Sequence, residues 1–175
     1  MKEVLLMYAR YTQRANASVI ALLDGLSVEA RNEDRKSYYK SLSGLASHVV
    51  GASLYFQGLF RASSPAAAKA LKTTEGMKVA EGSQTAAQWA ELKKASVAAD
   101  KATIDLVQAL SEAELAHPVK LDWYGGEPAA VPLCFLLHQL YVHGVHHRGQ
   151  ISQILDSMGV EHDFSGIDVE FLPKG

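Results

Sequence analysis

Apolar residues recur at alternating steps of three and four along four long segments of the chain. This spacing places side chains on one face of a helix. The pattern predicts helices over residues 2–26, about 36–61, about 85–110, and from Pro128 or Pro132 to about Met158. Because each helix has an apolar stripe to bury, the segments predict an all-α protein built as a four-helix bundle.

Local signals set the ends of these segments. Gly25 and Ser27 follow the first stripe, and Thr85 with Gln88 has the spacing of a capping box at the start of the third helix. Proline fits the first turn of the fourth helix, and Gly159 is a typical C-terminal stop.

The links between the helices differ in kind. About 20 residues join the second helix to the third, which is long enough for a crossover along the bundle. Between His117 and Glu127 apolar and polar residues alternate before Gly125-Gly126, which predicts a short extended hairpin. With an irregular tail over 160–175, we expect one domain spanning residues 1–175.

Composition narrows the range of functions. The 175 residues are 48% hydrophobic and 21% charged with a net charge of −2, as in an ordinary globular domain. No basic stripe is present, so nucleic-acid binding is not expected. A single cysteine, Cys134, excludes an intrachain disulfide framework and a multi-cysteine zinc site. We expect this thiol to be buried and inert within the apolar run 133–137.

Residues 41–60 and 128–147 contain no Asp, Glu, Lys or Arg. Each stretch has the length of a membrane span, but the serine, histidine and glutamine residues in both argue against one. The charged and amphipathic start of the chain does not resemble an export signal, so we expect a soluble, cytoplasmic protein. Helices without charge on any face also predict a homodimer, unless residues 62–84 and the tail cover them.

Three histidines lie on predicted buried stripes. His143 and His147 are four residues apart on the fourth helix, and His48 lies in the middle of the second. Imidazoles at this spacing can bind one metal ion together, although a single core histidine is more often a structural residue. We expect His138 to face away from the ligand positions and His146 to flank them. His117 in the loop and His162 in the tail are expected to be solvated, although a loop histidine could reach the site.

The run His143-Gly-Val-His-His147-Arg148-Gly149-Gln150-Ile151, together with the segment around His48, resembles the DinB-like superfamily. The amphipathic first helix with Asn16 is similar as well, and the resemblance extends to about residue 159. It implies a four-helix bundle that binds nickel, zinc or a similar divalent ion through His48, His143 and His147, with water completing the coordination. Some relatives are S-transferases or isomerases that use a low-molecular-weight thiol.

The leading hypothesis is therefore a metal-dependent enzyme that transfers a small thiol to a small-molecule electrophile. The alternatives are metal-dependent hydrolysis and a non-catalytic metal-binding or stress-response protein. No serine-hydrolase elbow, P-loop or dinucleotide fingerprint occurs, and no carboxylate lies on the ligand stripes. Tyr55 is expected to pack or to line the site. Arg148 is expected to bind a carboxylate bidentately or, in preference, to form an internal ion pair.

Overall fold

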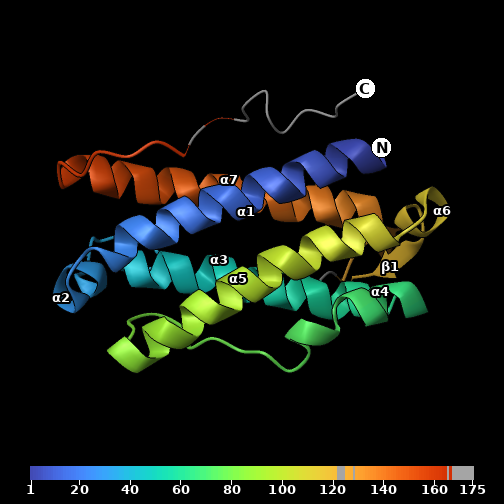
Figure 1. Cartoon of the computed structure of the whole chain (residues 1–175), viewed down its shortest axis with the longest axis horizontal. Coiled ribbons are helices and arrows are strands. Elements are labelled where there is room, and N and C mark those ends of the chain that lie inside the picture. Colours follow the sequence, from blue (N-terminus) through green and yellow to red (C-terminus); the bar gives the residue numbers. More distant parts are fainter. Residues whose placement is uncertain (122–124, 128, 165, 167–175) are drawn as a thin grey trace.

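The computed structural model describes residues 1–121, 125–127, 129–164 and 166. Most of this chain is helical, which confirms the all-α class. Figure 1 shows four long helices along the length of the molecule. They are α1 (Lys2–Asp24), α3 (Leu42–Arg61), α5 (Ala86–Ala109) and α7 (Leu133–Ser157).

The long helices do not pack in their sequence order. Helix α1 contacts α5 and α7, and α3 contacts the same two helices. Helices α3 and α5 run in one direction while α1 and α7 run in the other (Figure 1). The chain between α3 and α5 therefore returns along the molecule. It forms the short helix α4 (Pro65–Ala70) and the 3₁₀ turn η1 (Lys72–Thr74) on the way.

The second long helix begins later than the predicted residue 36. A short helix, α2 (Val28–Asn32), precedes a tight turn in which Lys36 and Lys40 have φ angles of 58° and 67°. Such left-handed residues cannot belong to a right-handed helix. Helix α3 begins only after Ser41, whose hydroxyl accepts a hydrogen bond from the Gly44 amide at 3.0 Å.

Other helix ends follow the predicted signals. The capping box at Thr85 and Gln88 is formed, and Gly159 has a φ of 67° beyond the end of α7. Another capping box starts the short helix α6 (Glu112–Leu115).

The expected hairpin is present, but it is placed differently. Strand β1 (Pro118–Lys120) pairs antiparallel with β2 (Ala130–Pro132), so the second strand lies beyond residue 127. Because Pro132 is still paired in β2, helix α7 starts at Leu133. The alternative start at Pro128 lies outside the described residues.

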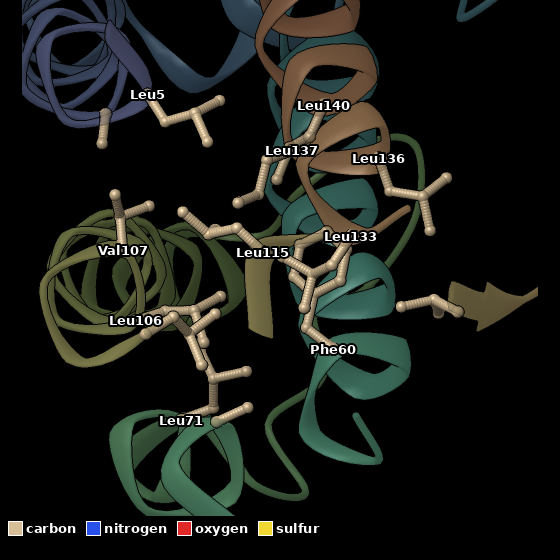
Figure 2. Packing of buried hydrophobic residues seen from close by; sticks show 14 of the residues in the cluster. Leu5, Phe60, Leu71, Leu106, Val107, Leu115, Leu133, Leu136, Leu137 and Leu140 are labelled. Atoms are coloured by element: carbon tan, nitrogen blue, oxygen red, sulfur yellow. The ribbon is translucent and has the colours of Figure 1, made fainter. Parts of the chain in front are cut away.

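Two clusters of buried side chains form the core. Figure 2 shows the first, where leucines of α7 meet Leu5 of α1, Phe60 of α3 and Leu106 of α5. The second cluster lies around Leu45 and Trp89. On α3 the stripe of residues that was predicted to be buried contains His48 and Tyr55. It lies at the edge of the buried face, since His48 is half-buried and Tyr55 is 46% exposed.

Within the described residues, every helix is too short or too polar to cross a membrane.

Candidate metal centre

Helices α3 and α7 bring three imidazole rings together. His143 Nε2 lies 3.0 Å from His48 Nε2 and 3.0 Å from His147 Nε2. One ligand atom from each of the three residues lies within 4.8 Å of the others. The contact between α3 and α7 therefore joins residues that are 95 positions apart in sequence.

Helix geometry explains why α7 supplies two of these side chains. Residues four apart lie on the same face, so His143 and His147 both point toward α3. Leu140 and Ile151 continue this face into the two core clusters, one on each side of the histidines. As a result His147 is buried, while His143 and His48 remain half-buried at the edge of a pocket.

Hydrogen bonds determine which ring nitrogens are free. His147 Nδ1 lies 2.7 Å from Gln150 Oε1, an acceptor, so the proton of the neutral ring is on Nδ1. The Tyr39 hydroxyl lies 2.9 Å from His48 Nε2 and can donate to it. The Nε2 lone pair of His147 is therefore free toward His143, whereas the Nε2 lone pair of His48 is engaged by Tyr39 when that hydroxyl donates.

The surroundings keep all three rings neutral. Burial, together with the charges that His147, His48 and His146 would carry, lowers the pKa of His143 to about 4. Burial also lowers the pKa of His48 and that of His147. At neutral pH the cluster therefore presents lone pairs rather than positive charges.

This donor set fits a divalent transition metal. Neutral imidazole is a ligand of zinc and nickel, and tetrahedral Zn–N bonds of about 2.0–2.1 Å place two nitrogens about 3.3 Å apart. The observed separations of 3.0 Å are close to that value. Hydrogen bonds among the three Nε2 atoms cannot satisfy all of them. Only His143 Nε2 is left to carry a proton, because the Nε2 atoms of His48 and His147 are unprotonated.

Tyr39 also belongs to this centre, and sequence analysis missed it. Its ring stacks on His48 with a centroid distance of 4.1 Å and meets His147 edge-on at 5.3 Å. The turn at Lys40 and the closeness of Gly44 to the Tyr39 carbonyl position this side chain. No periodic pattern marks such a turn, so the sequence carried no signal for it.

An open pocket of about 1350 Å³ leads to His48 and His143. Its walls are mostly apolar. Tyr55 is among the residues that line them, which was one of the two expectations for that residue. Glu81, from the connection between α3 and α5, also lines the pocket, and its charge partly opposes the lowering of the His48 pKa by burial. Searching only helical stripes for a carboxylate could not find it.

A comparison with protein-family models matches residues 1–167 to the DinB family. The chain belongs to the DinB family. A search among curated proteins found no match. The resemblance inferred from the histidine motif is thereby confirmed at the level of the family.

Arg148 of this DinB-family chain faces the interior, and it does not form the expected ion pair with any described residue. Its guanidinium is 3% exposed and donates to Asn16 Oδ1 at 2.9 Å, while Asn16 Nδ2 donates to Asp100 Oδ1 at 2.9 Å. Burial raises the pKa of Asp100 to about 7, although Asn16 and Arg148 act in the opposite direction. Arg148 is therefore linked to the Asp100 carboxyl through the side-chain amide of Asn16.

The remaining histidines of this DinB-family chain lie outside the triad, as expected. His138, His117 and His146 are exposed. The ring centroid of His146 lies 4.9 Å from that of His147. His162 was expected to be solvated, but it is partly buried and hydrogen-bonds with Ser152. Cys134 is half-buried against the first cluster rather than fully buried.

Proposed function

We propose that this DinB-family protein binds one divalent metal ion, nickel or zinc, through His48, His143 and His147. The convergence of three neutral Nε2 atoms, two of them from residues that line the pocket, carries this proposal. Gln150 holds His147 in the tautomer that a metal ligand needs, since it accepts the Nδ1 proton.

We further propose that the site is catalytic and takes a small-molecule substrate. Only three protein ligands are proposed, and a catalytic ion keeps at least one exchangeable position. The pocket supports this reading because it opens onto two of the three ligands. When bound, the ion would supply Lewis acidity, which lowers the pKa of a coordinated thiol or water.

The reaction we favour is S-transfer from a low-molecular-weight thiol to an electrophilic carbon. The thiol sulfur forms the new bond to carbon, the leaving group departs with its electron pair, and the thiol proton passes to solvent. The mostly apolar walls suit an apolar electrophile, while Glu81 is an exposed carboxylate at the pocket edge. Metal-dependent hydrolysis remains the enzymatic alternative.

A non-catalytic metal site would require a fourth protein ligand. Among the described residues, the Tyr39 hydroxyl is the oxygen that approaches a ligand nitrogen, at 2.9 Å from His48 Nε2. We propose that Tyr39 is not a ligand and that its hydroxyl faces the exchangeable position instead.

We also propose a cytoplasmic homodimer. A single free thiol, Cys134, is typical of a reducing compartment. Exposed apolar side chains on α7 support self-association, with Phe135 55%, Val142 48% and Val145 45% exposed. The alternative expectation was that residues 62–84 cover the uncharged helices. They do cover part of α3, since Val79 lies against Gly51. It leaves the α7 residues exposed.

Metal analysis of untagged protein tests the central proposal. We expect one nickel or zinc ion per chain in wild type and in the control His138→Ala, which changes an exposed histidine of the same helix. His143→Ala and His147→Ala should each lose stoichiometric metal. Full metal content in either variant would refute the proposed ligand set.

Tyr39→Phe separates the open from the closed site. We expect this variant to keep one metal ion per chain, because the ring packing is preserved and no ligand is lost. Loss of the ion would make Tyr39 the fourth ligand and favour a structural metal.

A thiol-consumption assay tests the reaction. Metal-loaded and metal-free protein are compared with a haloaromatic electrophile over a panel of small thiols. We expect thiol loss and halide release in equal amounts with the loaded protein only. No loss with any thiol, or equal rates with His147→Ala, would reject S-transfer.

A further inference from the structure

A second, small cavity also reaches His143. It is enclosed by the four long helices, and it offers about 10 Å³ to the centre of a water molecule. A space of about 10–15 Å³ is what one water requires. The side chains that matter around it come from α1 (Thr12, Asn16), α5 (Asp100) and α7 (Tyr141, His143, Arg148).

Several polar atoms of these lining side chains are buried without a hydrogen-bond partner in the described part of the chain. They are Thr12 Oγ1, Tyr141 Oη, His143 Nδ1, and Arg148 Nε and Nη2. Buried polar groups in folded proteins are nearly always paired. Such a group of them around one small cavity indicates a polar occupant.

Other hydroxyls on the same cavity are satisfied. Ser53 Oγ donates to the Val49 carbonyl at 3.1 Å, and Thr103 Oγ1 donates to the Ala99 carbonyl at 3.0 Å. The unpaired atoms are therefore a particular set that includes the second ring nitrogen of His143.

The chemistry of this set selects the occupant. The Arg148 guanidinium only donates, and His143 Nδ1 donates when its Nε2 is a metal ligand. The Asp100 carboxyl accepts on the same wall, and the hydroxyls of Thr12 and Tyr141 do both. An anion would face Asp100 and a cation would face Arg148, whereas a water molecule accepts and donates at once.

We infer that one buried water molecule occupies this cavity, accepts hydrogen bonds from His143 Nδ1 and Arg148, and links Asp100 to the histidine triad. Thr12 and Tyr141 are then positioning residues that hold this water. The inference rests on the proposed metal site for the location of the His143 proton. The pKa of Asp100, raised to about 7 by burial, agrees with a carboxyl that can share a proton with a water near neutral pH.

Crystal structures of the metal-free and metal-loaded wild type test the water directly. We expect a single ordered peak about 2.7–3.2 Å from both His143 Nδ1 and the Arg148 guanidinium. An empty cavity, or a direct hydrogen bond from Nδ1 to Thr12 or Tyr141, would overturn the inference.

Metal affinity tests the link to the triad. Thr12→Val and Tyr141→Phe each remove one hydroxyl at nearly constant shape, and partners of metal ligands are worth about 10–100-fold in affinity. We expect the metal dissociation constant to rise about tenfold in each variant, at the lower end of that range. Ser53→Ala is the matched control, because its hydroxyl lines the same cavity but bonds to its own helix, and its affinity should equal that of wild type.

The outcomes separate the two proposals. Lower thermal stability of Thr12→Val and Tyr141→Phe with unchanged metal affinity would mean that the polar cavity is only structural, and would overturn the link. A water peak in a protein that binds no metal would refute the metal site and keep the water site. Bound metal beside an empty cavity would refute only the inference drawn here.

Discussion

Gln150 holds His147, one of the three proposed metal ligands, in a single tautomer. Its Oε1 accepts the Nδ1 proton of His147 at 2.7 Å and so leaves Nε2 unprotonated. We predict that Gln150→Ala weakens metal binding about 10–100-fold without abolishing it. Gln139→Ala is the control, since Gln139 lines the pocket from the same helix, and its dissociation constant should not change. Equal affinities of the two variants in a competition titration would contradict this role.

A second residue-level prediction concerns pH and the metal-free protein. The pKa of His143 falls from 6.5 to about 4 on folding, so between these values the unfolded chain binds more protons than the folded one. The contribution of the neutral ring to the free energy of unfolding is therefore fully present above pH 6.5, and it is lost as the pH falls toward 4. His48 and His147 act in the same direction.

Asp100 opposes this trend. Its pKa rises from 3.8 to about 7 on folding, so the folded chain holds a proton that the unfolded chain releases as the pH rises from 3.8 to 7. We predict that Asp100→Asn loses stability more steeply than wild type between pH 6.5 and 4, by on the order of 3 kcal/mol. Urea unfolding at several pH values measures both slopes, and parallel slopes would show that Asp100 is ionised in the folded protein.

At the scale of elements, the start of α3 depends on one close approach. A Cβ atom at Gly44 would clash with the Tyr39 carbonyl oxygen, at 2.0 Å. This contact is between backbone groups, so no side-chain rotation can relieve it. We predict that Gly44→Ala lowers the free energy of unfolding by about 2 kcal/mol and displaces Tyr39 from His48.

The same helix provides a control for that substitution. A Cβ at Gly58 would have nothing within 4 Å, so Gly58→Ala should stabilise α3 by about 0.5–1 kcal/mol through helix propensity alone. A Gly44→Ala protein as stable as Gly58→Ala would show that the turn before α3 adapts easily.

The helices also show what sequence reasoning can and cannot find. Periodicity predicted the four long helices, because a helix repeats its contacts at a fixed spacing. It also predicted that His48, His143 and His147 lie on helix faces that point inward. Tyr39 depends on two left-handed lysines, and such a turn has no repeat to detect. The Asn16 contact with Asp100 joins two helices, and no rule within one helix predicts a polar contact between two of them.

At the scale of the whole molecule, the proposed dimer depends on the exposed apolar side chains of α7. Phe135, Val142 and Val145 follow each other at steps of seven and three, so they share one face. We predict that light scattering at micromolar concentration gives twice the chain mass of 18.9 kDa, and that Val142→Glu with Val145→Glu gives the single mass.

The control for assembly is Val97→Glu on α5, where the side chain is 69% exposed. It adds the same charge on another surface and should leave the mass unchanged. A wild-type protein of single mass would reject the dimer.

The separation of 95 residues between His48 and His143 has a consequence for folding. An ion bound by both would close a loop of slightly more than half of the chain, and that loop exists only after the last long helix has docked on α3. The ion would therefore bind the folded chain and not partly folded chains in which α7 has not yet docked. At a free concentration one hundred times its dissociation constant, it would stabilise that fold by about 2.7 kcal/mol. Metal supply would then set how long a newly made chain persists, as well as whether it is active.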